Sequence, residues 1–221
     1  MSILRTPVLA GLLSLTLAAC SSGAKVPDWQ LEAKGAMERS VAAYLEGNSR
    51  VEAAEFTRAK AEISATGRVD LLARAELLHC AAHLASLVFE PCAGFEKLRP
   101  DAAPAERAYA DYLAANLRPQ DAALLPPSQR AAAESVDGAV KNIADPLSQL
   151  VAAATLFRAG RASPELVQKA VDSASAQGWR RPLLAWLGVQ ASLADKTGDT
   201  QDAARIRRRI ELTLNAGLPA R

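Results

Sequence analysis

Apolar and polar residues follow one another along most of this chain with the period of an α-helix. Alanine-rich runs place apolar side chains three and four positions apart, and most runs end at a glycine or a proline. No run alternates apolar and polar residues over the length of a strand, and the β-branched and aromatic residues are scattered. The pattern therefore predicts an all-α protein.

The breaks between the runs predict where each helix begins and ends. Asp145-Pro146 and Ser163-Pro164 each join a capping side chain to a proline, which is tolerated in the first turn of a helix. Three prolines and Gly94 predict that residues 90–104 are a loop. We expect Asp28 to cap the first helix, and the expected helices are 28–46, 50–66, 69–89, 104–117, 128–143, 146–159, 164–177, 181–196 and 199–216.

Short connections predict that neighbouring helices form antiparallel hairpins. The segment VQASLADKTGDTQDAARIRRRIE carries Ala191 seven residues before Gly198 and Ala203 five residues after it. This segment resembles a tetratricopeptide repeat (TPR), in which small residues let two helices approach and glycine accepts the left-handed turn. The spacing around Gly47 fits in part, because Glu52 stands where the repeat has a small residue.

The TPR resemblance implies antiparallel helical hairpins that stack as a right-handed solenoid. An irregular α-helical bundle is the alternative, since alanine-rich hairpins alone produce a similar pattern. In either case, we expect residues 28–217 to form a single α-helical domain.

The first twenty residues have the features of an export signal. Arg5 precedes an apolar core over residues 8–17, and small residues come just before Cys20. The apolar run is shorter than a membrane-spanning helix requires. An ordinary secretory signal cleaved nearby, or a chance apolar N-terminus, is the alternative interpretation.

Residues 17–20, LAAC, resemble the lipobox of bacterial lipoproteins. The resemblance implies that residues 1–19 are removed and that the thiol of Cys20 is joined to diacylglycerol, with residues 20–27 as a lipidated tether. Ser21 and Ser22 stand where an aspartate would indicate retention at the inner membrane. We therefore expect a lipid anchor in the outer membrane, on the periplasmic face.

The charge of the chain limits its partners. It has 26 Lys and Arg against 24 Asp and Glu, a formal net charge of +2. Proteins that bind nucleic acid need a strong basic excess to meet the phosphates. We therefore expect no nucleic-acid partner; the expected partners are the membrane, through the lipid at Cys20, and another cell-envelope protein.

Two cysteines and two histidines lie close together in the sequence. In an oxidising compartment, Cys80 and Cys92 are expected to form a disulfide. His79 and His83 share a helix face and could bind zinc together with the two thiols. However, Cys80 lies about 100° around the helix from His79. The disulfide is the favoured interpretation, and we expect no metal and no cofactor.

No residue pattern in the sequence indicates catalysis. The sequence contains no Gly-x-Ser-x-Gly elbow, glycine-rich phosphate loop or HExxH motif. Glu52 and Glu55 lie in a run rich in arginine and lysine, where exposed ion pairs are expected. The sequence therefore favours a non-enzymatic adaptor for cell-envelope assembly or maintenance, with its binding residues unidentified. The alternatives are an envelope enzyme and a metal or small-molecule carrier that uses the region of His79 and His83.

Overall fold

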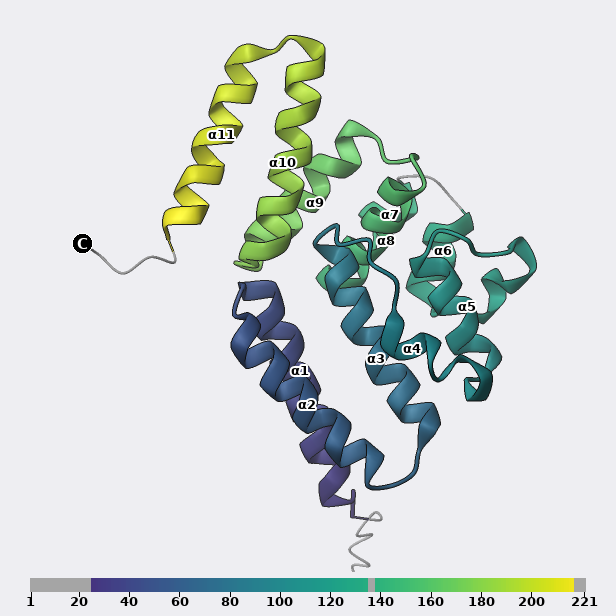
Figure 1. Ribbon diagram of the computed structural model, residues 1–221. Coiled ribbons are helices and arrows are strands. Elements are labelled where there is room, and N and C mark those ends of the chain that lie inside the picture. Colours follow the sequence, from purple (N-terminus) through teal and green to yellow (C-terminus); the bar gives the residue numbers. More distant parts are fainter. Residues whose placement is uncertain (1–24, 135–137, 217–221) are drawn as a thin grey trace, which may run out of the picture.

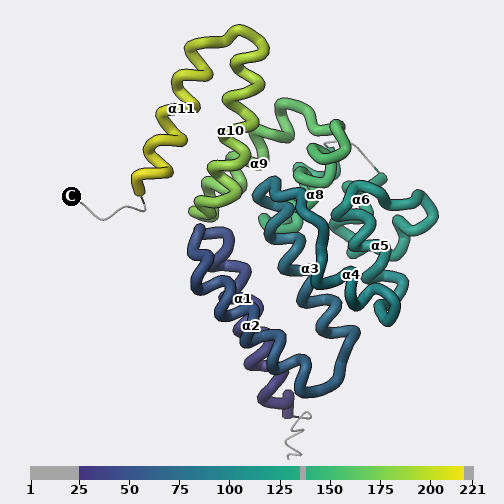
Figure 2. Tube along the Cα trace, viewed as in Figure 1, coloured from purple at the N-terminus to yellow at the C-terminus, as the bar shows by residue number. Residues whose placement is uncertain are grey.

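The computed structural model describes residues 25–134 and 138–216, and most of these are helical, with no strand among them. Figure 1 shows the α1–α2 hairpin lying beside α3, and a body of helices from α3 to α9 beyond it. The α10–α11 hairpin projects from this body, and Figure 2 shows its two arms running antiparallel. The predicted all-α class is confirmed.

The helices are joined mostly by short connections. Two 3₁₀ turns, η1 (Arg99–Asp101) and η2 (Pro119–Leu124), lie between them. The α-helices are α1 (Asp28–Glu46), α2 (Ser49–Ser64), α3 (Val69–Ala85), α4 (Ala93–Glu96), α5 (Pro104–Leu113), α6 (Pro127–Glu134), α7 (Gly138–Lys141), α8 (Pro146–Arg158), α9 (Pro164–Ala176), α10 (Arg180–Thr197) and α11 (Thr200–Asn215).

Two predicted caps are confirmed and one is wrong. The carboxylate of Asp145 accepts a hydrogen bond from the Ser148 amide at 2.7 Å, and Ser163 caps α9 in the same way. Asp28, by contrast, is the first residue of α1 itself, and Pro27 occupies the cap position. An acidic residue in the first turn still interacts favourably with the helix dipole.

Four predicted elements differ clearly from the structure. The helix expected over 104–117 ends at Leu113, and the backbone turns at Ala115 with φ of 59°. The helix expected over 69–89 ends at Ala85, because the backbone turns at Leu87 with φ of 60°. Within the helix expected over 128–143, the structure describes α6, which ends at Glu134, and α7, which ends at Lys141; residues 135–137 lie outside the described residues. The predicted loop 90–104 contains the single-turn helix α4, whose Phe95 is fully buried, and η1.

The main hydrophobic core lies between α3, α8, α9 and α10. Residues 149–156 of α8 are all buried, so this helix passes through the centre of the core. Trp186 of α10 is 0 % exposed, and its Nε1 donates to the carbonyl of Ala85 at the end of α3 at 3.0 Å. A smaller cluster around Phe56 and Ala36 joins the α1–α2 hairpin to α3.

The α10–α11 hairpin contains the features expected from the segment that resembles a repeat. Gly198 has a φ of 76° at the turn, and Ala191 and Ala203 are buried in the core. Ile206 is buried as well, whereas Arg205 and Arg207 on the opposite side pair with acidic residues. The arginine-rich run is therefore the solvated face of an amphipathic helix.

None of the described helices has both the length and the apolarity that crossing a membrane would require.

Candidate functional site

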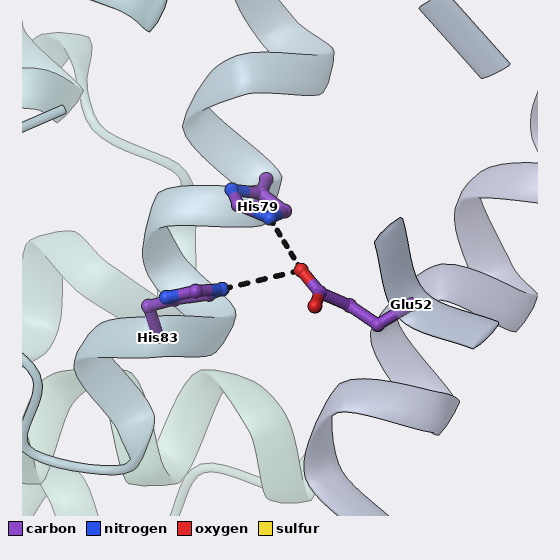
Figure 3. A group of neighbouring side chains, drawn as sticks. All are labelled: Glu52, His79 and His83. Carbon is purple, nitrogen blue, oxygen red and sulfur yellow. Dashed lines mark hydrogen bonds and ion pairs between the residues drawn. The ribbon is translucent and has the colours of Figure 1, made fainter. Parts of the chain in front are cut away.

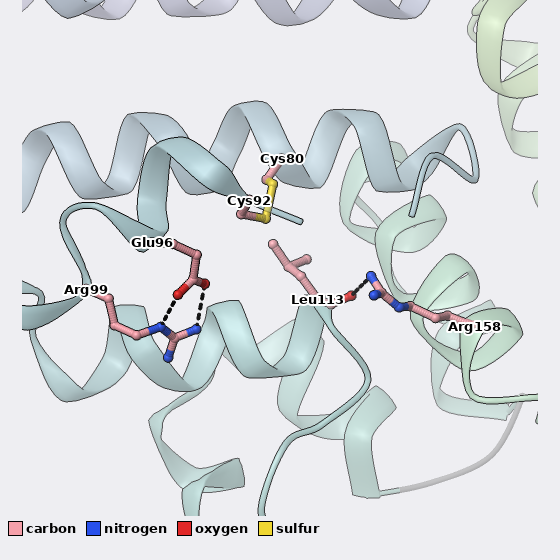
Figure 4. The surroundings of a disulfide bond; sticks show 6 residues. All are labelled: Cys80, Cys92, Glu96, Arg99, Leu113 and Arg158. Atoms are coloured by element: carbon pink, nitrogen blue, oxygen red, sulfur yellow. Dashed lines mark hydrogen bonds and ion pairs between the residues drawn. A yellow bond between two sulfur atoms is a disulfide. The ribbon is translucent and has the colours of Figure 1, made fainter. Parts of the chain in front are cut away.

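The predicted disulfide between Cys80 and Cys92 is present. It joins α3 to the residue before α4, and the two Cα atoms are 5.8 Å apart (Figure 4). Arg158 donates to the carbonyl of Leu113 nearby. With both sulfurs in this bond, the thiolates that would have completed a Cys-His zinc site with the two histidines are not available.

His79 and His83 instead face a carboxylate from a different helix. Figure 3 shows both imidazoles on α3 directed at Glu52 of α2. Oε1 of Glu52 lies 2.7 Å from Nε2 of His79 and 3.4 Å from Nε2 of His83. Helix geometry explains the convergence, because residues four apart lie one turn above the other on the same face.

The expected role of Glu52 is wrong, whereas that of Glu55 is confirmed. Glu55 pairs with Arg39 across the α1–α2 hairpin, as expected for an exposed ion pair. Glu52 is buried, and its charge is directed at the two histidines. The sequence did contain a signal, since Glu52 replaces the small residue expected five positions after Gly47.

The imidazoles lie within a stack of aromatic rings that we call the ring column. His83 stacks on Tyr44 of α1 with ring centroids 3.9 Å apart, and His79 stacks on Phe56 of α2 at 4.1 Å. The two imidazoles are themselves 4.3 Å apart. A cation lies over each outer ring. In order, the column and its cations are Arg181, Tyr44, His83, His79, Phe56 and Lys60.

The surroundings of His83 favour its neutral form. Burial lowers the pKa of His83 below its ordinary value, and the neighbouring His79 lowers it further. The hydrogen bond with Glu52 acts in the opposite direction and raises the pKa of His83, whereas the positive charge of Arg181 lowers this pKa. A neutral imidazole keeps one nitrogen lone pair, which is the form that binds a metal ion.

A second feature is an apolar groove formed by two adjoining pockets of about 670 Å³ and 470 Å³. The larger pocket lies between α1 and α3, with Ile63 of α2 contributing, and the smaller lies between α3, α5 and η2. Arg74 and Leu78 of α3 line both. The exposed leucines of this groove are Leu31, Leu78 and Leu124, at 56 %, 38 % and 42 % exposure.

Arg74 and Trp29 give the groove its polar and aromatic elements. Nε of Arg74 donates to Glu106 of α5 at 2.7 Å, so an ion pair links α3 and α5 beside the smaller pocket. Trp29 is half-buried in the wall of the larger pocket.

Comparison of the chain with models of known protein families, with curated proteins and with solved structures finds no match. Cys20, the predicted site of lipid attachment, lies outside the described residues. Four of the predicted site residues lie in the described part of the chain. Cys80 and Cys92 bond to each other, and His79 and His83 face Glu52.

Proposed function

We propose that this protein is a periplasmic lipoprotein, anchored in the outer membrane through Cys20, that binds another cell-envelope protein through the apolar groove. In this proposal its helices are TPR-like hairpins, and it acts by binding rather than by catalysis. The groove is the observation that carries the proposal. Large apolar side chains that gather at one exposed site are typical of surfaces that bind a partner.

The shape of the groove favours a helical occupant. Leu31, Leu78 and Leu124 come from α1, α3 and η2, so they line the groove along its length. An amphipathic helix buries its apolar face in such a groove through side chains three, four and seven positions apart. Arg74, whose side chain is 61 % exposed, lies where the two pockets meet and suits a partner with an acidic residue near its apolar face.

Leu78→Glu is expected to weaken partner binding at least about tenfold, because it places an unpaired charge where the two pockets join. Leu212→Glu is the matched control. Leu212 is also an exposed leucine, at 73 %, but it lies on α11 outside the groove. A photo-crosslinking residue at position 31 or 124 would capture the partner in cells, and mass spectrometry would measure the yield for each variant.

The groove proposal requires three results together. Crosslinks must form from groove positions, Leu78→Glu must lose them, and Leu212→Glu must keep them, with unchanged circular dichroism in both variants. Equal yields from the two glutamate variants, or no captured protein above background from any groove position, would refute it.

Cys20→Ala is expected to abolish attachment to membranes. The thiol is the atom that would carry diacylglycerol, and stable anchoring needs more than one acyl chain. Intact-mass measurement of the mature protein should give an N-terminal cysteine with its acyl chains, and fractionation should find the Cys20→Ala protein in the soluble fraction. A Cys20→Ala protein that still fractionates with the outer membrane would contradict the lipid anchor. The groove proposal is tested separately, by the crosslinking experiment.

A further inference from the structure

We propose that Glu52, His79 and His83 bind one divalent transition-metal ion, with Zn²⁺ as the reference ion, and that this ion links α2 to α3. The proposal does not depend on the apolar groove. The three residues form the candidate ligand set, each offering one ligand atom, and these atoms lie within 4.8 Å of one another.

The spacing of the three atoms suits a single ion. Zinc lies about 2.0–2.2 Å from imidazole nitrogen and carboxylate oxygen, so two ligand atoms at a tetrahedral angle are roughly 3.4 Å apart. Oε1 of Glu52 is 2.7 Å from one Nε2 and 3.4 Å from the other. Small side-chain rotations therefore open the set enough to admit an ion, with no change in the path of either helix.

The chemistry of the ligands selects the class of metal. Two imidazoles and one carboxylate suit zinc, copper, nickel or cobalt, whereas calcium and magnesium prefer sets made of oxygen alone. Three protein ligands leave a fourth position open for water. The side chains of His79 and His83 are 26 % and 28 % exposed, so water can reach them.

The ring column holds the ligands in place before an ion arrives. His79 and His83 are each fixed on one side by an aromatic ring, so few rotamers are lost when a metal binds. In the metal-free protein, an imidazole N–H donates to the carboxylate of Glu52. In the metal-bound form, the ring proton is on Nδ1, which leaves the lone pair of Nε2 for the ion.

Charges on the neighbouring helices leave an approach open to a cation. The histidines line a pocket of about 220 Å³ together with Glu76 and Glu90, and the carboxylate of Glu90 attracts positive ions. Two cations lie near, but each is behind an aromatic ring: Arg181 over Tyr44 at 4.2 Å and Lys60 over Phe56 at 4.6 Å. Lys60 also pairs with Glu76 at 3.3 Å.

The test is a titration of the full chain, without an affinity tag, after removal of metal by a chelator and with the disulfide intact. Calorimetry with Zn²⁺ should give one ion per chain, and Co²⁺ should give the visible absorption of a low-coordinate site. Glu52→Gln should weaken Zn²⁺ binding by at least tenfold, since it removes the charged ligand and preserves the size of the side chain. His79→Phe should do the same while preserving the stacking.

Glu55→Gln is the matched control, because Glu55 lies on the same helix but pairs with Arg39 and does not face the histidines. It should bind Zn²⁺ as the wild type does. Zn²⁺ should also raise the melting temperature of the wild type and of Glu55→Gln, and that of Glu52→Gln by less at the same Zn²⁺ concentration. Absence of stoichiometric Zn²⁺ binding, or equal affinity in the wild type and in Glu52→Gln, would overturn the metal site.

Discussion

Trp186→Ala is expected to lower the free energy of unfolding by about 3–5 kcal/mol, the range for truncating a large buried aromatic side chain. The indole is fully buried, its ring packs against that of Phe157 in a T-shaped pair with ring centroids 5.7 Å apart, and its Nε1 donates to the carbonyl of Ala85. The substitution removes the ring contact and leaves both a cavity and an unpaired carbonyl at the end of α3. Urea denaturation followed by circular dichroism measures the change.

Two further variants separate the contributions of Trp186. Trp186→Phe keeps an aromatic ring but loses the N–H donor. It should therefore lower the free energy of unfolding by less, about 1–3 kcal/mol. Trp29→Ala removes a tryptophan that is only half-buried in the groove, so it should destabilise the chain less than Trp186→Ala. A loss below about 1 kcal/mol for Trp186→Ala would mean that α10 does not pack against α3 as described.

Removing the disulfide is expected to lower the free energy of unfolding by about 3 kcal/mol. The bond joins residues twelve positions apart, and closing a loop of this size restricts the unfolded chain by about that amount in the chain-entropy model. Cys80→Ser with Cys92→Ser is the variant to compare with the wild type by urea denaturation under oxidising conditions.

Reduction provides the control for the disulfide prediction. A reductant should lower the stability of the wild type to nearly that of the double serine variant, and it should leave the double variant unchanged. Free thiols at both Cys80 and Cys92 in protein isolated from cells without reductant would contradict the prediction, as would a double variant as stable as the oxidised wild type.

The features that the sequence predicts correctly depend on neighbouring residues. Asp145 and Ser163 cap their helices through amides three residues ahead, and Gly198 accepts a positive φ that other residues rarely adopt. These preferences act within one turn of the chain. The disulfide is of the same kind, because the two cysteines are close in sequence and the intervening loop brings them together.

The features that the sequence does not predict depend on contacts between distant residues. Nε1 of Trp186 on α10 donates to the carbonyl of Ala85 at the end of α3, 101 residues away along the chain. The site has the same origin. Glu52 lies 27 residues from His79 along the chain, and only the packing of α2 on α3 brings them together.

Because of its position, α11 unfolds locally more easily than the helices of the core. Among the described helices, α10 is the only one against which α11 packs extensively, and Ala203 and Ile206 are the only residues of α11 that are buried. Local opening therefore exposes little apolar surface and leaves Trp186 and the rest of the core closed. The C-terminal arm can thus fray and re-form, or be trimmed by a protease, without disturbing the ring column or the groove.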